Sequence, residues 1–402
     1  MKYTDFFFWL SFAVVFYTFL GYGMLLAILV AIKKMFMKKG EAVNTLFQPP
    51  LTLIIPCYNE AEIIPAKISN SQQLDYPADL LTIVLITDGS SDHSENIMKQ
   101  YPDIVWLHEN KRAGKTAAEN RAMKFVTTPF VIFTDANTIL NRDALKNIVK
   151  HFADERVGCV AGEKRIISAV ADSASSSGEE IYWKYESFLK KMDAELNSAI
   201  GAAGELVAFR TSLYTELPDD TLLDDFMQSM LIAAKGNIIA YEPQAYASET
   251  ASSNISEELK RKIRIGAGSW QAMARLTGVL KLTKTPLLYF QYFSHRILRW
   301  AVAPFLLPAL LILNILLAVD GPNFYQGLLI LQLFFYAAAF AGYLLENKKI
   351  PFKLIFIPYY FCVMNYAVIA GLFRFLSGNQ QAAWEKAQRK SLHNLLRLSA
   401  FI

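Results

Sequence analysis

The sequence contains few charged residues and few cysteines. Charged residues make up 19% of its 402 residues and hydrophobic residues make up 53%, which places the chain on the apolar side of an average soluble protein. Its three cysteines (Cys57, Cys159 and Cys362) are scattered, so they form no metal-binding or disulfide pattern. The sequence also lacks the Gly-x-Gly-x-x-Gly turn of dinucleotide-binding folds and the Gly-x-x-x-x-Gly-Lys-Ser/Thr turn of P-loops. Any phosphate would therefore have to be held through a metal rather than by a glycine-rich loop.

Charge is completely absent from a long segment near the N-terminus, residues 6–32. The segment is long enough to cross a hydrocarbon core of about 30 Å with some tilt. It is too long for a signal-peptide core, and Lys2 alone precedes it as a basic residue, so we expect a retained membrane anchor over residues 1–40. A buried core helix is the alternative. Three more apolar segments follow within residues 286–376, at 301–319, 324–345 and 354–372. The sequence predicts an integral membrane protein with a soluble middle domain, residues 45–285.

Basic residues beside the apolar segments predict the orientation, because basic loops stay cytoplasmic. Lys33 and Lys34 follow the first segment directly, which places the middle domain in the cytoplasm of a cell with the protein in its inner membrane. Four crossings would then export the basic tail, residues 377–402, against the rule. Either one apolar segment does not cross or the rule is broken here. The net charge of +4 lies mainly beside the membrane, which favours anionic lipids rather than nucleic acid as partners.

Three apolar runs in the middle domain end in polar loops. Residues 51–56 are followed by Tyr58 and Glu60, residues 81–86 by Asp88, and residues 130–134 by Asp135 and Asn137. Such runs are typical of buried parallel strands, and ligands bind beyond the carboxyl ends of those strands. We expect these side chains to converge on one polar site.

The pattern changes after about residue 153. Asp219, Asp220, Asp224 and Asp225 crowd a short acidic region before a predicted helix at residues 226–234. Residues 256–276 form a predicted basic amphipathic helix just before the membrane segments. Such helices usually lie in the plane of the membrane interface.

Together these motifs resemble the inverting, nucleotide-diphosphate-sugar-dependent glycosyltransferases of family 2. The resemblance covers residues 51–271 and is greatest to the membrane-embedded branch with cellulose, chitin, hyaluronan and poly-N-acetylglucosamine synthases. It implies an α/β, nucleotide-diphosphate-sugar-binding (GT-A-like) domain with a mostly parallel sheet, flanked by N- and C-terminal transmembrane helices.

The resemblance also implies residues that bind the donor. Pro56, Tyr58 and Glu60 match the family's first nucleotide-binding loop, and Asp88 matches its base-reading aspartate. A carboxylate accepts the imide N–H of uracil, which favours UDP over purine donors. Lys115 matches a lysine that places a positive charge near the nucleotide.

The segment Asp135-Ala136-Asn137 matches the family's Asp-x-Asp motif, which holds Mg²⁺ or Mn²⁺ against the diphosphate. Asn137 replaces the second acid. Its amide oxygen still ligates a hard cation, but the site has lost one negative charge. Asp135 therefore carries most of the protein's share of the metal, and Asn137 is either a weak ligand or none.

Asp224 and Asp225 match the pair that carries the family's catalytic base, with Asp225 in the base position. The alternative is that these acids only favour the N-terminus of the next helix, which is our interpretation of Asp219 and Asp220. Arg264 matches the diphosphate-binding arginine of the Gln-x-x-Arg-Trp motif, but Ile265 replaces the tryptophan on which a polymer end stacks.

The sequence thus predicts a metal-dependent, inverting transfer of one sugar to a lipid-linked or growing polysaccharide acceptor at the membrane. A processive polysaccharide synthase is the second interpretation. A catalytically silent membrane scaffold with the same fold is the third, and the loss of an acid at Asn137 is the feature that favours it.

Overall fold

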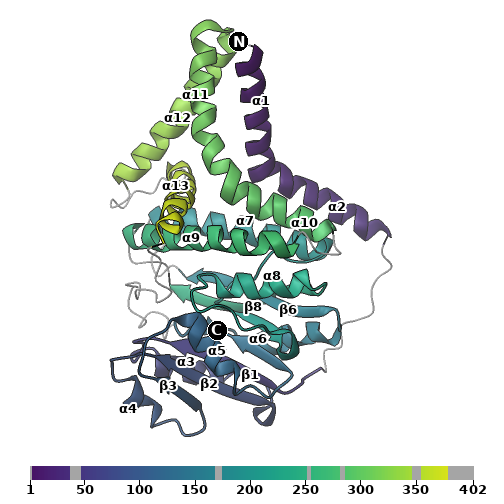
Figure 1. Ribbon diagram of the computed structural model, residues 1–402, viewed down its shortest axis with the longest axis vertical. Helices are drawn as coiled ribbons and strands as arrows, with labels where there is room; N and C mark the ends of the chain where they lie inside the picture. Colours follow the sequence, from purple (N-terminus) through teal and green to yellow (C-terminus); the bar gives the residue numbers. More distant parts are fainter. Residues whose placement is uncertain are drawn as a thin grey trace.

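A computed structural model of the chain describes residues 2–36, 47–167, 174–250, 255–280, 286–345 and 355–378. Most of the predicted basic tail lies outside these residues. The molecule has three tiers: a sheet domain at one end, a layer of long amphipathic helices beside it, and apolar helices that project from the other side (Figure 1).

The sheet contains eight strands among the described residues, in the order β3-β2-β1-β4-β7-β6-β8-β5. Their bounds are β1 Leu51–Cys57, β2 Leu81–Asp88, β3 Val105–Glu109, β4 Phe130–Phe133, β5 Ile139–Leu140, β6 Val157–Ile167, β7 Val207–Arg210 and β8 Ile238–Thr250. The strands from β3 to β4 are all parallel, whereas β7 runs antiparallel to both β4 and β6. The predicted α/β fold is therefore confirmed, with a sheet that is parallel from β3 to β4 and mixed beyond β4.

Helices cover both faces of the sheet. They are α3 Ile64–Gln72, α4 Ser94–Met98, α5 Lys115–Met123, α6 Ala144–Val149 and α8 Asp224–Ala234. Alternate residues of β1 enter different cores, because successive side chains of a strand point to opposite faces. Leu53 and Ile55 pack with Ile68 of α3, whereas Ile54 packs with Ala118 of α5. This two-sided burial explains why the strand sequences are continuous apolar runs.

The remaining helices form the layer and the projecting tier. They are α1 Lys2–Phe16, α2 Tyr22–Phe36, α7 Ala174–Leu196, α9 Ile255–Leu280, α10 Pro286–Tyr292, α11 Ala303–Asp320, α12 Asn323–Leu345 and α13 Phe356–Leu376. Short π-helical segments, Tyr17–Gly21 and Phe293–Val302, join α1 to α2 and α10 to α11. In the described part of the chain, four helical segments are long and apolar enough to cross a membrane: Lys2–Phe36, Pro286–Asp320, Asn323–Leu345 and Phe356–Leu376. These agree with the predicted apolar segments.

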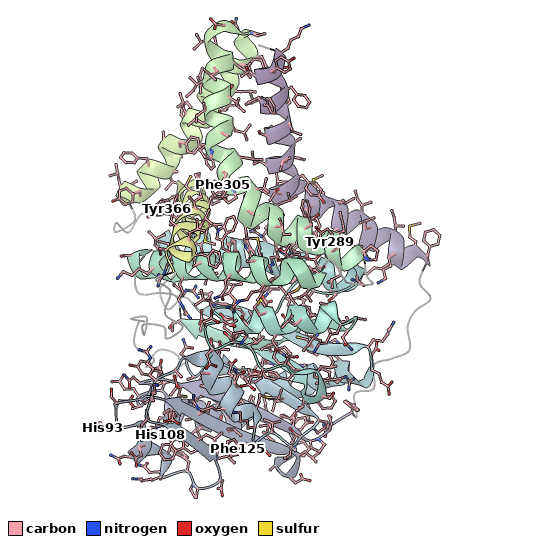
Figure 2. The ribbon with its side chains drawn as sticks, in the orientation of Figure 1. His93, His108, Phe125, Tyr289, Phe305 and Tyr366 are labelled. Atoms are coloured by element: carbon pink, nitrogen blue, oxygen red, sulfur yellow. The ribbon has the colours of Figure 1, made fainter. Side chains whose placement is uncertain are left out.

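Helix α13, the fourth apolar helix, has a different direction from the other three. Helices α1 and α11 follow the long axis of the molecule and α12 slopes back toward the sheet domain, whereas α13 is seen nearly end-on where it crosses α9 (Figure 1). Exposed aromatic residues, Tyr289, Phe305 and Tyr366, lie where the projecting apolar helices meet the layer of long helices (Figure 2). Aromatic side chains gather at membrane–water interfaces. Trp270 of α9, which belongs to the predicted interfacial helix, donates a hydrogen bond to the carbonyl of Val368 in α13 at 3.1 Å.

Candidate active site

The loops after β1 and β2 meet, as the strand pattern predicts. The backbone N–H of Ser91 donates to Asn59 Oδ1 at 2.8 Å, and that of Ala61 donates to Asp92 Oδ2 at 2.9 Å. Asn59 has a positive φ of 52°, a conformation that asparagine tolerates better than most residues. The carbonyl of Glu60 accepts the N–H groups of Ile63 and Ile64 at the start of α3. Glu60 thus lies at the predicted edge of the sheet.

Four of the predicted donor-binding residues line one pocket. It has an empty volume of about 230 Å³ and is lined by Pro56, Cys57, Tyr58, Asp88, Arg112, Gly114, Lys115 and Ala118. The guanidinium of Arg112 lies over the Tyr58 ring, 3.7 Å from its centroid. An aromatic ring and a planar cation together are surfaces on which a nucleobase stacks. The stacking of Arg112 on Tyr58 could not be predicted from the sequence, because the two residues are distant along the chain.

Asp88 anchors the loop before α5. Its Oδ2 accepts the backbone N–H groups of Ala113 at 3.0 Å and Gly114 at 2.6 Å, and its Oδ1 accepts Arg121 Nη2 at 2.8 Å. Gly114 has a φ of +105°, which favours glycine. A carboxylate oxygen has two lone-pair sites, so Asp88 can hold this loop and still face the pocket.

Lys115, the first residue of α5, lies among four carboxyl groups. Its Nζ is 2.9 Å from Asp135 Oδ1 and 3.7 Å from both Asp224 Oδ2 and Glu119 Oε1. A Cβ on Gly204 would lie 2.7 Å from this Nζ and 3.2 Å from Asp225 Oδ2, so the glycine makes room for both groups. Burial lowers the pKa of Lys115, but the acids outweigh it and raise the pKa well above its ordinary value. One fixed cation therefore links the predicted metal-binding loop to the predicted base.

Asp224 and Asp225 form the first turn of α8. The backbone N–H of Phe226 donates to Asp225 Oδ1 at 2.7 Å. Burial, and then the neighbouring charge of Asp224, raise the pKa of Asp225 to about 7, against the opposing effect of Lys115. A carboxyl group with this pKa is suited to accept a proton near neutral pH.

Glu119 is a site residue that sequence reasoning missed. It is 5% exposed and lines a second pocket with Asp224, Asp225 and Gly204. Burial, and then Asp224, raise the pKa of Glu119 well above its ordinary value. Its position one helical turn after Lys115 was the available signal, because residues i and i+4 share a helix face. Glu205, another acid in this region, forms a buried ion pair with Lys164.

Lys67 of α3 holds the loop with Asp135 and Asn137 through the residues on either side of it. Its role was not predicted from the sequence. The buried Nζ of Lys67 donates to Thr134 Oγ1 at 3.0 Å and to the Thr138 carbonyl at 2.8 Å. Burial lowers the pKa of Lys67 to about 7, although Asp135 opposes this. The conformation of the loop is therefore stabilised by hydrogen bonds from within the protein.

The donor set of this loop is suited to a metal that shares its coordination with a diphosphate. In the described residues, no group of three or more His, Cys, Asp or Glu side chains could hold a metal ion. Asp135 supplies one carboxylate and Asn137 an amide oxygen, and Mg²⁺ is commonly held by one or two protein ligands plus substrate phosphates. Lys115, which is paired with Asp135, would then share that carboxylate with the metal.

Arg264 of α9 lies within charge–charge range of the acids of the site. Burial lowers its pKa, and Arg374 of α13 adds to this, whereas Asp224, Asp135 and Asp225 oppose it.

By contrast, Asp219 and Asp220 have contacts that fit a structural role. Asn120 Nδ2 donates to Asp219 at 3.4 Å, and Arg275 pairs with Asp220 at 2.7 Å.

Comparisons with known proteins identify a sequence family over part of this chain. Residues 52–217 match the family "Glycosyl transferase family 2", a range that includes Asp88, Lys115 and Asp135 and ends before Asp225. Poly-beta-1,6-N-acetyl-D-glucosamine synthase of Staphylococcus aureus (strain COL) is 26% identical over 248 residues, which are 59% of this chain and 59% of that protein. The synthase of Staphylococcus epidermidis is 26% identical over 255 residues, 61% and 60% of the two chains.

These matches span about 60% of the length of the curated relatives. Among solved structures, the mannosyltransferase PcManGT from Pyrobaculum calidifontis, in complex with GDP-Man and Mn²⁺, superposes with a TM-score of 0.70 at 24% identity. The superposition covers 93% of this chain and 99% of that one. The two chains therefore share a fold over nearly their whole length, including the apolar helices. The chain therefore carries a glycosyltransferase family 2 domain on a GT-A fold.

Proposed function

We propose that the protein transfers a sugar from a nucleotide diphosphate sugar to a glycan acceptor at the membrane, with inversion at the anomeric carbon. The observation that carries the proposal is the cluster around Lys115. It brings Asp225, whose pKa is raised to about 7, next to the loop with Asp135. The family 2 domain supports the same reaction class.

In the proposed step Asp225 is the base. It accepts the proton of the acceptor hydroxyl as the oxygen attacks the anomeric carbon. The bond from that carbon to the diphosphate oxygen breaks, and the nucleoside diphosphate leaves with the electron pair. Lys115 stays between the base and the leaving group as a fixed positive charge. Burial raises the pKa of Glu119 well above its ordinary value, which favours its neutral form beside the base.

A divalent metal, Mg²⁺ or Mn²⁺, held by Asp135 and Asn137 would offset the charge that develops on the departing diphosphate. Arg264 supplies a planar fork of donors that suits phosphate oxygens. The nucleobase is placed against Tyr58 and Arg112, and Asp88 favours uracil. A UDP-linked donor is the first to test, and N-acetylglucosamine is the first sugar, because the matched relatives are named for that polymer.

The second candidate is a processive polysaccharide synthase, which the names of the matched relatives favour. Ile265 argues for short products, because it offers no aromatic face for a polymer end. Stacking on an aromatic ring contributes on the order of 1–3 kcal/mol on nucleic-acid platforms. Long polymer made by the purified enzyme at low acceptor concentration would select the synthase.

We also propose that the sheet domain faces the cytoplasm at the inner membrane, with lipids as partners of the helices. The basic end of α2 is attached to the C-terminal end of α7, in the layer of helices beside the sheet domain. Lys33 Nζ donates to the carbonyls of Glu195 and Leu196 at 3.0 and 2.8 Å, and Lys34 pairs with Glu195 at 2.7 Å. This contact supports a sheet domain on the side of the membrane that basic residues prefer.

The test of the proposed function uses isolated membranes that contain the wild-type protein or the Asp225→Asn variant. Each is incubated with radiolabelled nucleotide sugars and Mn²⁺, and label is counted in the lipid-extractable and polymer fractions. We expect one donor to give product that depends on Asp225. If no donor labels the wild-type membranes above the variant membranes, the proposed function is wrong.

A further inference from the structure

Helices α9 and α13 cross at two glycines. A Cβ on Gly371 would lie 2.5 Å from the backbone carbon of Gly266 and 2.6 Å from the nitrogen of Ala267, and a Cβ on Gly266 would lie 2.7 Å from the Ala367 carbonyl oxygen. Such distances leave no room for a side chain at either position. The backbone of α13 therefore rests directly on α9, and the hydrogen bond from Trp270 to Val368 fixes the crossing from one side.

The crossing determines which residues of α13 face the sheet domain. Ala367, Gly371 and Arg374 are spaced i, i+4 and i+7, so they share one helix face. Ala367 is 1% exposed and Gly371 is buried, which shows that this face is turned toward α9. Arg374, one turn further on, is only partly exposed. It lies close enough to Arg264 for the two charges to repel.

Arg374 has no ion pair with any carboxylate in the part of the chain that the structure describes. Four arginines in or near the layer of helices do have such pairs: Arg261 pairs with Glu258, Arg275 with Asp220, and both Arg296 and Arg299 with Glu186. Arg374 is a partly exposed arginine within charge–charge range of a second arginine, Arg264, which in turn is within that range of the acids of the site. An anion relieves the repulsion between two such arginines. Guanidinium groups bind phosphate through parallel hydrogen bonds.

We propose that Arg374 binds a phosphate group of the donor diphosphate together with Arg264, so that α13 completes the donor site. The inference rests on the proposed function, because it names a further residue of the same site. Arg264 connects α13 with the candidate active site. It lies within charge–charge range of Arg374 on α13 and of Asp135 and Asp224 in the site. A phospholipid head group is the other phosphate that could reach α13, and the experiment distinguishes it from the donor diphosphate.

The experiment measures nucleotide binding to the full chain in nanodiscs by isothermal titration calorimetry. The probes are UDP, UMP, GDP and GMP with Mn²⁺, and the variants are Arg374→Gln and Arg374→Lys. Hydrogen bonds to charged groups contribute enough for a loss of about ten- to a hundredfold in affinity. We expect that loss for the diphosphate and a change of less than about threefold for the monophosphate. Arg374→Lys should recover part of the affinity, because it keeps the charge but not the fork.

Two controls make the result specific. Phe373→Ala changes a neighbouring side chain that is 67% exposed and should leave both affinities unchanged. Gly371→Leu should reproduce the selective loss of diphosphate affinity, because it lifts α13 from α9. The ratio of diphosphate to monophosphate affinity is the readout, so a general loss of folded protein does not imitate the result.

The lipid arm repeats the titrations in nanodiscs with and without phosphatidylglycerol. If Arg374→Gln loses diphosphate affinity equally in both, the donor is the ligand. If its loss depends on the anionic lipid, or if diphosphate binding is unchanged, the inference is wrong while the proposed function stands. If the wild-type protein binds neither diphosphate, the proposed function fails and this inference fails with it.

Discussion

At the scale of single residues, Asp225 is the most direct test of the chemistry. Asp225→Asn preserves the shape of the side chain and removes its ability to accept a proton, so we expect turnover to fall by roughly 10²–10⁴. Donor affinity, measured by titration with the nucleoside diphosphate, should stay unchanged because the base contacts only the acceptor. Asp224→Asn is the matched control and should cost less. Turnover above about a tenth of wild type in Asp225→Asn would contradict the assignment.

The raised pKa of Asp225 predicts a pH dependence with a definite sign. Turnover requires the unprotonated carboxylate, so the wild-type rate should rise with pH through about 7 and this inflection should be absent from Asp225→Asn. Stability should change in the opposite direction. The folded protein keeps a proton that the unfolded chain releases near pH 4. Asp225 therefore contributes less to the free energy of unfolding as pH rises from about 4 to about 7, which chemical denaturation at several pH values measures.

The metal-binding loop gives a second test at this scale. Asn137→Asp restores a second carboxylate beside Asp135, so we expect a lower Mn²⁺ concentration for half-maximal nucleoside diphosphate binding. Asn137→Ala is the control and should not lower it. If Asn137→Asp leaves the Mn²⁺ requirement unchanged, Asn137 is not a metal ligand.

The sequence predicted the acids of the site better than their partners. Asp88, Asp135 and Asp225 follow strands or begin a helix, and strand ends and helix starts can be recognised from local patterns. Glu119 and Lys67 were missed because their roles depend on burial beside residues distant in the sequence. Local patterns carry no information on such contacts, and the same holds for Arg374, whose helix was identified only as an apolar segment.

At the scale of elements, the start of α8 is held from both sides. The Phe226 ring next to Asp225 packs against Gly201, and Trp300 of the membrane-side π-helix lies 5.3 Å from Phe226 between ring centroids. Arg296 of the same π-helix donates to the Ile200 carbonyl through Nη2 at 3.0 Å. The membrane helices thus help to position the proposed base.

This packing predicts that Gly201→Ala is damaging. Gly201 has a φ of +86°, and a Cβ there would overlap the Phe226 ring. We expect a loss of about 1–3 kcal/mol in stability from strain and steric overlap, together with reduced turnover. Gly236→Ala is the matched control, since Gly236 has a φ of +96° but no atom within 4 Å of the added Cβ. If chemical denaturation shows equal losses for both variants, the contact with Phe226 has no energetic effect.

The elements themselves show what a sequence pattern can and cannot predict. The strands β1, β2 and β4 and the helices α8 and α9 were predicted from apolar runs and helical spacing. The antiparallel insertion of β7 between β4 and β6 was not, because pairing partners depend on the whole chain rather than on one segment. The predicted interfacial helix is α9, yet one of its faces is covered by α13 rather than by lipid alone.

At the scale of the whole molecule, the direction of α13 bears on a question that the sequence left open, the number of membrane crossings. Four crossings would place the basic tail on the side opposite the sheet domain. In the structure, the N-terminal end of α1 and the α11–α12 connection lie together at the far end of the molecule, and α12 returns the chain toward the sheet domain (Figure 1). Helix α13 then crosses α9 at its glycine contact instead of running back. Three crossings and one helix lying in the interface agree with the positions of the basic residues.

This arrangement predicts that the C-terminus and the sheet domain lie on the same side of the membrane, with the N-terminus on the other. A fluorescent protein fused to the C-terminus should be fluorescent in a bacterial host, and alkaline phosphatase fused there should be inactive, because the first matures in the cytoplasm and the second outside it. The reporters exchanged to the N-terminus are the control and should give the reverse result. Active phosphatase at the C-terminus would mean that α13 crosses the membrane. In that case its contact with α9 would not persist in the bilayer, and Arg374 could not reach the donor site.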